Sequence, residues 1–437
     1  MFRRKMQMNQ HDDATLIRQE IDEILRTKII PFWLQRSVDE VYGGYLTSFD
    51  ENGRADGKTD KYIVTQCRMV WGFSHLLPYA DVADRPAMLA AAGQGVKFLI
   101  DRFWDNRHGG FAWQVARNGT VLDSAKLVYG ESFAIYAFSE YFLQTGDRAA
   151  LHYAERTFDL LQVHAADTLN GGYYENLEAD WSRSPGGFAA GDRKSLDIHM
   201  HLMEAFTTLY QATQKDIHRR KLSEVVCLIL RHMVNREAGY GYNQFDAAFN
   251  KLPAININRT WNAERETNET IGEPTDTTSY GHNVELSWLM GLALQVLEQQ
   301  PGALAEDGAA AAGLVDRVIL QRLLDHSLQF GYDHEFGGVY RDGVADQKVL
   351  VTDKEWWQNF ESLVGYLNGY RQYGQRAYWA AFVQTWRFVK EKFLNLAVGE
   401  SRQLLDRRGT PIVANLGNPW KGIYHTGRAL AECLDRL

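Results

Sequence analysis

The residues best suited to chemistry lie in four short segments, where histidines stand beside carboxylates within otherwise apolar sequence. In the first segment, residues 197–205, the spacing puts Asp197, His201 and Glu204 on one face of a helix. His199 points about 200° away from His201 on a regular helix, so this pair does not chelate one metal ion. The alternative, a solvated polar stripe, fits poorly with the apolar residues LMEAFTTLY that surround it.

The other three segments have a similar composition. His282 and Glu285 stand three residues apart at the start of a predicted helix, where the helix dipole alone would favour an acidic residue. The third segment, WWQNFE (residues 356–361), has two adjacent tryptophans that cannot face the same side of a helix, so one can fill the core while the other walls a pocket. In the fourth, His425 and Arg428 are again three residues apart.

This set of residues favours proton transfer over metal or phosphate chemistry. The sequence contains no HExxH zinc motif, no P-loop, no GxGxxG after a strand and no GxSxG elbow. Histidine has the ordinary pKa nearest to neutral pH, so it can both accept and return a proton. We therefore expect proton abstraction next to a carbonyl group, without a metal ion and without a cofactor.

The composition narrows the possible partners and the compartment. A net charge of −8 and an isoelectric point near 5.9 give no basic footprint for nucleic acid, and they suit a neutral, sugar-like substrate. Cys67, Cys227 and Cys433 form neither a disulfide framework nor a zinc spacing. No signal peptide and no apolar run of about 18 residues is present. We expect a cytoplasmic protein that does not contact membranes.

A weak internal repeat predicts how these segments are positioned. A glycine turn followed by an aromatic or apolar residue recurs, mostly at roughly 62 to 68 residues. The copies are Gly43-Gly44-Tyr45, Gly109-Gly110-Phe111, Gly171-Gly172-Tyr173, Gly239-Tyr240-Gly241, Gly337-Gly338-Val339 and a looser one near Gly399. Apolar residues between the turns follow the helical period, and each repeat has room for two helices.

The repeat predicts an all-α fold of six helix pairs that close into a double ring, with short β-hairpins at one end. A linear helical solenoid is the alternative, although glycine-turn hairpins are unusual in solenoids. We expect one domain over residues 1–437. The polar, non-periodic segment of about residues 245–278 predicts a long loop on the pocket side.

Seven blocks make the chain resemble the N-acylglucosamine 2-epimerase superfamily, and within it the cellobiose and mannose 2-epimerases. The blocks are GGYLTSFDENG, QCRMVWGFS, GGFAWQV with YGESFAIYAFSEY, HMHLMEAFTTLY, SYGHNVELSWLM, EWWQNFESLVGYLNGY and NPWKGIYHTGRA, in the family's order. They span nearly all of the chain after about residue 30. The resemblance implies an (α/α)6 barrel, in agreement with the repeat.

The resemblance also implies roles for the candidate residues. Arg68 and His201 would stabilise an enediolate, and His282 and His425 would act on opposite sides of C2. Glu285 and Glu361 would orient histidines or bind hydroxyl groups, and Trp357 and Trp420 would be pocket aromatics. We also expect Asp197, Glu204 and Arg428 to contribute to substrate binding. The implied activity is a sugar 2-epimerase that opens the ring and forms a cis-enediolate.

Some positions depart from the family pattern. Asp197 stands where Asn is usual, and Gln-Asn-Phe (residues 358–360) stands where Pro-Gln-Ala is usual. The last block, Gly-Ile-Tyr-His-Thr (residues 422–426), differs as well. These changes surround the substrate, so a disaccharide, free mannose or glucose, and an N-acetylated sugar all remain open.

Other functions remain as alternatives. An aldose–ketose isomerase of the mannose–fructose type would use similar residues. A glycoside hydrolase on the same fold would need two carboxylates across the bond, with Glu204, Glu285, Glu361 and Asp276 as candidates. A non-catalytic sugar-binding protein would not need the three histidines together. We expect a monomer or a homodimer.

Overall fold

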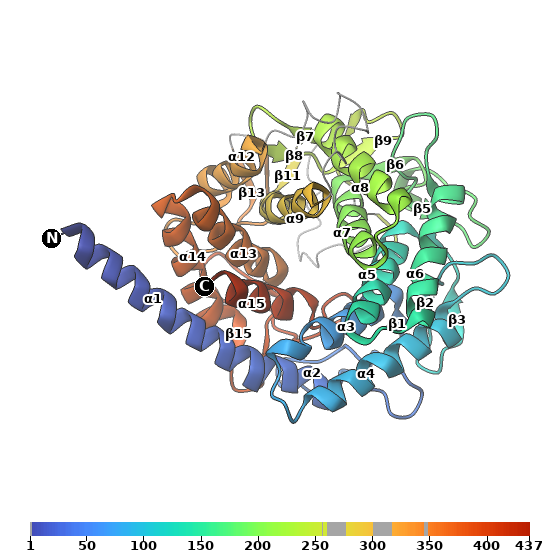
Figure 1. Cartoon of the computed structure of the whole chain (residues 1–437), viewed down its shortest axis with the longest axis horizontal. Coiled ribbons are helices and arrows are strands. Elements are labelled where there is room, and N and C mark those ends of the chain that lie inside the picture. The colour runs from blue at the N-terminus through green and yellow to red at the C-terminus, as the bar shows by residue number, and fades with distance from the viewer. Residues whose placement is uncertain (1, 256, 260–276, 300–316, 345–347) are drawn as a thin grey trace.

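Two concentric rings of helices make up the structure (Figure 1). The computed structural model describes residues 2–255, 257–259, 277–299, 317–344 and 348–437. Within these ranges, neighbouring inner helices pack in chain order, and the last also packs against the first. The inner helices are α3 (Ile63–His75), α5 (Val128–Thr145), α7 (Leu196–Thr213), α9 (Tyr280–Glu298), α13 (Trp356–Tyr373) and α15 (Tyr424–Arg436). The ring is closed, so the predicted (α/α)6 barrel is confirmed and the linear solenoid is excluded.

An outer helix packs against each inner helix. Five outer helices follow their inner partner along the chain, namely α4 (Arg85–Phe98), α6 (Arg148–Leu160), α8 (Asp216–Leu228), α12 (Val318–His326) and α14 (Arg376–Phe388). The sixth partner is α1 (Phe2–Ile24), which packs against α15 and is continued by α2 (Ile30–Arg36). The last helix pair therefore takes one helix from each end of the described chain (Figure 1).

Burial explains which helices are inner and which are outer. All residues of α3 from Ile63 to Ser74 are buried, because an inner helix is covered by two ring neighbours and by an outer helix. In α6 only Ala150, Ala154, Thr157 and Phe158 are buried, at the i, i+4, i+7 and i+8 spacing of an amphipathic helix. One apolar cluster joins the two rings. No described helix is long and apolar enough to cross a membrane.

Short turns and strands connect the helices. A five-residue π-helical turn follows each outer helix: η1 (Leu25–Ile29), η3 (Leu99–Phe103), η4 (Leu161–Ala165), η6 (Ile229–Met233), η7 (Ser327–Gly331) and η8 (Val389–Phe393). Two 3₁₀ turns, η2 (Leu77–Tyr79) and η5 (Gly187–Ala189), lie in other connections.

Every strand lies in a connection from an outer helix to the next inner helix, so the strands gather at one end of the ring, where they form small antiparallel sheets. Three-stranded sheets consist of β1 (Lys61–Tyr62), β2 (Gln114–Val115) and β3 (Val121–Asp123); of β6 (Arg193–Ser195), β9 (Gln244–Asp246) and β10 (Lys251–Leu252); of β11 (Thr277–Ser279), β12 (Asp342–Val344) and β13 (Lys348–Val351); and of β14 (Lys354–Glu355), β17 (Leu404–Leu405) and β18 (Pro411–Val413). Two-stranded sheets pair β4 (Lys126–Leu127) with β5 (Asn176–Leu177), β7 (Val234–Asn235) with β8 (Tyr240–Gly241), and β15 (Leu394–Asn395) with β16 (Glu400–Ser401).

In five of the six units a buried lysine ties the hairpin to the inner helix, and we call this ion pair the clasp. In the third unit, Lys194 lies just before α7, and its Nζ is 2.8 Å from Oδ2 of Asp167, the aspartate that opens the Gly171-Gly172 turn. Equivalent clasps are Lys61–Asp39, Lys126–Asp105 and Lys354–Asp333, at 2.9 to 3.1 Å. In the sixth unit Asn395 opens the turn, and the clasp lysine Lys421 pairs instead with Glu400, which follows Gly399, at 3.0 Å. The fourth unit has the uncharged Asn235 and Thr278 at these positions. The predicted glycine repeat therefore coincides with a buried lysine–carboxylate pair in five of the six units.

A second repeated contact accounts for His199. Five residues after the clasp position, an inner-helix side chain accepts a backbone N–H from the glycine turn. His199 Nε2 accepts from Tyr173 at 3.1 Å, as Gln66, Glu131, Asn283 and Asn359 accept in their own units. The prediction that His199 points away from His201 is therefore confirmed, because His199 contacts the glycine turn whereas His201 lines the pocket described below.

The segment of residues 245–278 contains more structure than the loop predicted from sequence. It begins within the β9–β10 hairpin and ends in β11. Ala254, Ile255 and Ile257 border the pocket, so the described part does lie on the pocket side. Residue 256 and residues 260–276, including Asp276, lie outside the described residues.

Candidate active site

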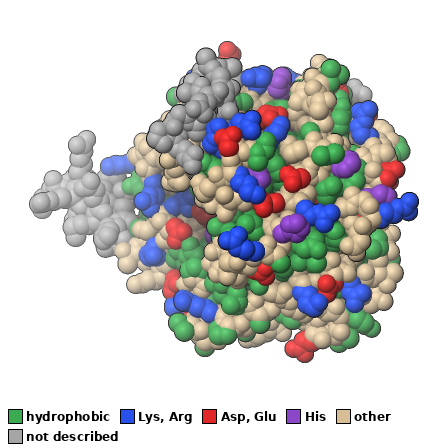
Figure 2. All heavy atoms as spheres, turned by 45° about the vertical axis from the view of Figure 1, so that its right-hand side comes forward, with side chains coloured by type: hydrophobic (Ala, Val, Ile, Leu, Met, Phe, Trp, Pro, Cys, Tyr) green, Lys and Arg blue, Asp and Glu red, His purple; other side chains and the backbone are tan. Residues whose placement is uncertain are grey.

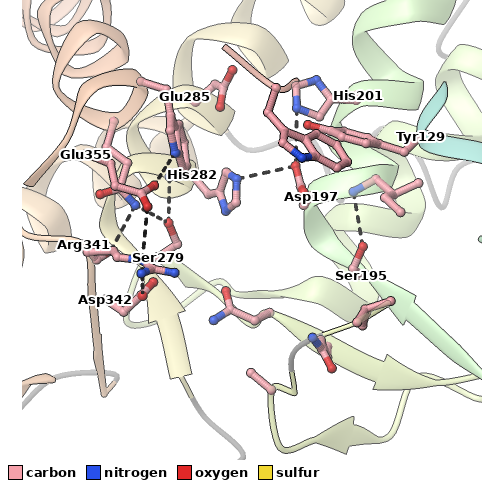
Figure 3. A pocket seen from close by; sticks show the side chains of 18 of the residues that line it. Tyr129, Ser195, Asp197, His201, Ser279, His282, Glu285, Arg341, Asp342 and Glu355 are labelled. Atoms are coloured by element: carbon pink, nitrogen blue, oxygen red, sulfur yellow. Dashed lines mark hydrogen bonds and ion pairs between the residues drawn. The ribbon is translucent and has the colours of Figure 1, made fainter. Parts of the chain in front are cut away.

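A pocket of about 240 Å³ lies at the end of the ring where the inner helices begin (Figure 3). The hairpins lie at this same end, and every inner helix presents residues of its first turns to the pocket. The lining residues are Arg68, Tyr129, Ser195, Asp197, Ile198, His201, Asn243, Gln244, Ala254, Ile255, Ile257, Thr277, Ser279, His282, Glu285, Arg341, Asp342, Glu355, Trp356, Trp357, Gln358, Trp420 and His425.

Equivalent positions of the repeat form two layers across the ring. Seven residues after each clasp position, the inner helices carry Arg68, Phe133, His201, Glu285, Glu361 and Arg428. Four residues after it, they carry Thr65, Gly130, Ile198, His282, Gln358 and His425. Two helix turns thus supply most of the charged and titratable groups at the site, and within each layer every group comes from a different helix.

Asp197 lies between two histidines (Figure 3). Its Oδ1 is 3.3 Å from His201 Nε2 and 3.5 Å from His282 Nε2. Burial opposes charge on His201, but hydrogen bonds to Asp197 and to Glu204 raise its pKa to about 9. Burial likewise opposes charge on His282, and the charge of Asp197 outweighs it and raises the His282 pKa. Both histidines therefore favour the protonated form.

His425 is in the opposite state. Its Nδ1 is 2.8 Å from Glu361 Oε1. Burial, together with the positive charges of Arg68 and Arg428, holds the pKa of His425 well below its usual range. His425 is therefore neutral at physiological pH. The pocket thus contains one neutral histidine and two that favour the charged form.

Arg428 lies beneath the pocket among three carboxylates. Its guanidinium bonds Glu204 and Glu285, and its Nη2 lies 2.7 Å from Glu361 Oε1. Burial and the neighbouring Glu285 raise the pKa of Glu361 to about 8, although Arg428 acts against this shift. The arginine thereby holds the carboxylates that in turn contact His201 and His425.

Arg68 reaches the pocket from α3. Its Nη1 donates to the carbonyl oxygen of Trp420 at 2.8 Å, and its Nη2 donates to the Tyr129 hydroxyl at 2.9 Å. The guanidinium also lies 4.5 Å from the Phe133 ring centre. These contacts fix a positive charge at the pocket wall, where it can stabilise a developing oxyanion.

Aromatic rings line two sides of the pocket. The Trp357 ring centre is 4.6 Å from that of His282 and 5.8 Å from that of His425. Trp420 stacks near Tyr129 at 6.2 Å. Trp356 is only 2% exposed and Trp357 is half-buried, but both tryptophans line the pocket, so Trp356 belongs to the pocket wall as well as to the core. Such faces suit the apolar C–H surfaces of a sugar ring.

One group of side chains has the spacing of metal ligands. Ligand atoms of Glu285, Glu361 and His425 lie within 4.8 Å of one another. Arg428 Nη2 already contacts both of these carboxylates, so a positive charge is present among them. The cluster therefore fits a network built around a guanidinium.

The structure brings eight of the eleven predicted site residues to the pocket wall. Glu204, Glu361 and Arg428 are not among the lining residues. Glu204 contacts His201 and Glu361 contacts His425, and Arg428 bonds both of these carboxylates. The sequence motifs did not point to three other lining residues, Tyr129, Arg341 and Glu355. Tyr129 lies in a block that carries the family resemblance, whereas no pattern in the sequence singles out Arg341.

The face of the molecule shown in Figure 2 carries mixed charge. On the face shown in Figure 2, basic and acidic side chains are interspersed and do not gather in one basic patch. This face offers no extended binding surface for a polyanion.

Comparisons with known proteins agree with the barrel fold. The family model of N-acylglucosamine 2-epimerase matches residues 44–429. A cellobiose 2-epimerase of Bacteroides fragilis is 27% identical over 430 residues, covering 96% of this chain and 99% of the relative. A D-mannose isomerase of Marinomonas mediterranea is 24% identical, covering 94% and 96%. The solved cellobiose 2-epimerase of Spirochaeta thermophila has a TM-score of 0.79 and 27% identity, with 97% of each chain covered.

Proposed function

The chain belongs to the N-acylglucosamine 2-epimerase family and is a carbohydrate isomerase, and from this premise we propose that it inverts C2 of an aldose by two-histidine acid–base catalysis. The proposed substrate is of the glucose or mannose type, either free or at the reducing end of a disaccharide. The observation that carries the proposal is the pairing of a neutral His425 with a His282 that favours protonation, both against Trp357.

The reaction begins with ring opening, because only the open aldehyde makes the C2 proton acidic. His425 then removes that proton, and the C2–H electron pair becomes the C1–C2 double bond of a cis-enediolate. Arg68 and the charged His201 stabilise the negative oxygen as it forms. His282 delivers a proton to C2 from the opposite face, which gives the epimer and leaves His282 neutral and His425 charged.

An aldose–ketose isomerase is the second candidate, and one contact favours it. His282 Nε2 lies 3.5 Å from Asp197, and a histidine held by this carboxylate is less available to the substrate. His425 would then return the proton at C1 while the proton of the O2 hydroxyl passes to O1, and the product would be a ketose. A relative named as a D-mannose isomerase is consistent with this route.

The pocket gives less support to hydrolysis. Glu285 is paired with Arg428, and the Glu355 carboxylate accepts from Trp357 Nε1 at 2.5 Å. Neither carboxylate is left as the isolated acid or base that a glycosidase pair requires. The histidines of the pocket, in contrast, differ in protonation as an epimerase requires.

Proton NMR in D₂O tests the proposal directly. Cellobiose, mannose, glucose and N-acetylmannosamine are offered separately to the purified enzyme. Deuterium at C2 together with a new epimer signal is the expected result, and the responding sugar identifies the substrate class. A ketose signal would support the isomerase, new reducing ends would support a hydrolase, and no exchange in any sugar would contradict the proposed reaction.

A further inference from the structure

Two polar atoms beside the pocket have no hydrogen-bond partner among the described residues. They are Nη1 of Arg341, on the residue before β12, and Oε1 of Gln358, in the first turn of α13. Both residues line the pocket. Buried polar groups in proteins are nearly always satisfied, so an unpaired donor and an unpaired acceptor beside one cavity indicate a missing ligand atom.

The surrounding contacts hold both side chains in place. Arg341 Nε lies 3.1 Å from Asp342 Oδ2 and 3.7 Å from Glu355 Oε1 (Figure 3). Gln358 Nε2 donates to Ser279 Oγ at 3.1 Å and to the Arg341 carbonyl oxygen at 3.2 Å. Because that carbonyl oxygen can only accept, it fixes the orientation of the amide and leaves Oε1 as the free acceptor.

The repeat supports a role for these residues in the pocket. Gln358 stands four residues after the clasp lysine Lys354, the position that His425 occupies after Lys421 and His282 occupies after Thr278. Gln358 therefore belongs to the same layer as the two proposed catalytic histidines. Gln358 also packs against Gly281, where an added Cβ would lie 2.4 Å from its Cγ, so α9 and α13 meet closely at this point.

The charges around Arg341 indicate what kind of ligand fits. Asp342 and Glu355 already neutralise the guanidinium, so an anionic group placed there would also meet two carboxylates. A hydroxyl group can accept from Arg341 Nη1 and donate to Gln358 Oε1 at the same time. A neutral hydroxyl group therefore fits this pair of side chains better than a phosphate or a carboxylate does.

We propose that Arg341 and Gln358 together bind one hydroxyl group of the sugar, at C3, C4 or C6, and so determine which aldoses the pocket accepts. The inference rests on the proposed function only in taking an aldose as the ligand. O1 and O2 are left to Arg68 and His201, and the Arg341–Gln358 pair provides a separate contact on a different part of the sugar.

A thermodynamic cycle tests the pair by combining a substitution in the protein with the removal of one hydroxyl group from the sugar. Dissociation constants of glucose, mannose and their 3-, 4- and 6-deoxy forms are measured from the fluorescence of the pocket tryptophans, for wild type and for Arg341→Lys. We expect one deoxy sugar to bind wild type about 10- to 100-fold more weakly than its parent, since the hydrogen bond involves a charged group. In Arg341→Lys, the parent and that deoxy sugar should bind about equally.

Two further variants complete the experiment. Gln358→Met should remove the discrimination for the same hydroxyl position, and it decides the question if Arg341→Lys does not fold. Arg402→Lys is the matched control, because Arg402 bonds backbone carbonyls of Lys392 and Phe393 away from the pocket.

Each outcome bears on the inference. An equal deoxy penalty in wild type and in both pocket variants would overturn it, as would the absence of binding by any of these sugars. Tighter binding of the 6-phosphate than of the parent sugar would indicate an anion site instead. C2 exchange is followed on the same samples, so discrimination without turnover would contradict the proposed reaction alone, and turnover without discrimination would contradict the hydroxyl site alone.

Discussion

Asp197 controls the protonation of one side of the pocket. A single carboxylate oxygen faces both His201 and His282, and it favours the charged form of each. Burial raises the pKa of Asp197, but the charge of His282 and the hydrogen bonds from both histidines outweigh it and lower that pKa well below its usual range. Asp197 thus stays ionised, and an amide at this position would lose the electrostatic part of the effect.

This arrangement predicts how activity depends on pH. His201 has a raised pKa of about 9, so its charge is present below that pH and is lost as the pH rises through it. We expect kcat/KM to fall on the alkaline side near pH 9, because enediolate stabilisation is lost. In Asp197→Asn the alkaline limb should move to lower pH by about one unit or more. Initial rates across pH 6 to about 10 measure this, and an unmoved limb would remove Asp197 from the account.

Substitutions of the two proposed catalytic histidines should impair different steps of the reaction. His425→Asn should lower kcat by about 10² to 10⁴ and abolish deuterium exchange at C2, since the base is gone. His282→Asn should still exchange the C2 proton while epimer formation falls by a similar factor. The NMR experiment separates the two signals. His164→Asn, an exposed site away from the pocket, is the control, and identical behaviour of the two pocket variants would argue against opposite faces.

Removal of metal ions should leave turnover intact. The Glu285, Glu361 and His425 group has the spacing of a metal site, but Arg428 already supplies positive charge to both of its carboxylates. Rates are compared before and after dialysis against a chelator. A loss of activity that a divalent ion restores would overturn the proposed metal-free mechanism.

At the level of the elements, the clasp converts the hairpins into supports for the inner helices. The buried lysine reaches the aspartate of the glycine turn and, in the third and fifth units, also donates to a backbone carbonyl of that turn at 2.7 Å. The hairpin and the first turn of the inner helix thus become one rigid piece. The fourth unit lacks the charged pair, and it carries His282 at the start of α9.

Clasps should differ in how much they stabilise the fold. Asp333 and Asp39 each keep a second cation, Arg407 and Arg117, whereas Lys194 is the cation that holds Asp167. Lys194→Met should therefore destabilise the protein by about 3–5 kcal/mol, because it leaves a buried charge unpaired. Lys354→Met should lower the free energy of unfolding by less, because Arg407 still pairs with Asp333.

Thermal melting of both variants measures the difference. Adding Asp167→Asn to Lys194→Met should recover part of the loss, because the unpaired charge disappears. An equal fall in melting temperature for Lys194→Met and Lys354→Met would argue against a compensating role for Arg407.

The helices and turns are easier to predict from the sequence than how far below the pocket surface each site residue lies. The glycine turns are visible as a repeat, and so are the helical periods between them. The register of the repeat is not visible, because it depends on the clasp lysines, and without them Arg341 and Gln358 have no assigned place in the pocket. Glu204, Glu361 and Arg428 are predicted as substrate contacts because helix spacing gives the face of a residue but not its depth below the pocket.

At the level of the whole molecule, the closure of the ring is predictable from the sequence. The arrangement of the side chains in the pocket is only partly predictable. Six helix pairs of similar length imply a closed double ring, and the structure has it. The pocket depends on long-range contacts, such as Glu204 with Arg428 over more than two hundred residues, which no local pattern encodes. The single domain and the cytoplasmic location stay predictions.

The last helix pair consists of the C-terminal inner helix α15 and the N-terminal outer helix α1. Which unit counts as the first therefore depends only on where the termini lie in the ring. In the five other units the chain runs from the inner helix to the outer helix. The pair of α15 and α1 would follow the same rule if the two ends of the chain were joined. The ring is therefore topologically circular, and circular permutants that begin at another glycine turn keep all of its helix contacts. It also follows that the ring cannot close during synthesis until α15 has emerged, so α1 must wait for its partner while the rest of the chain is made.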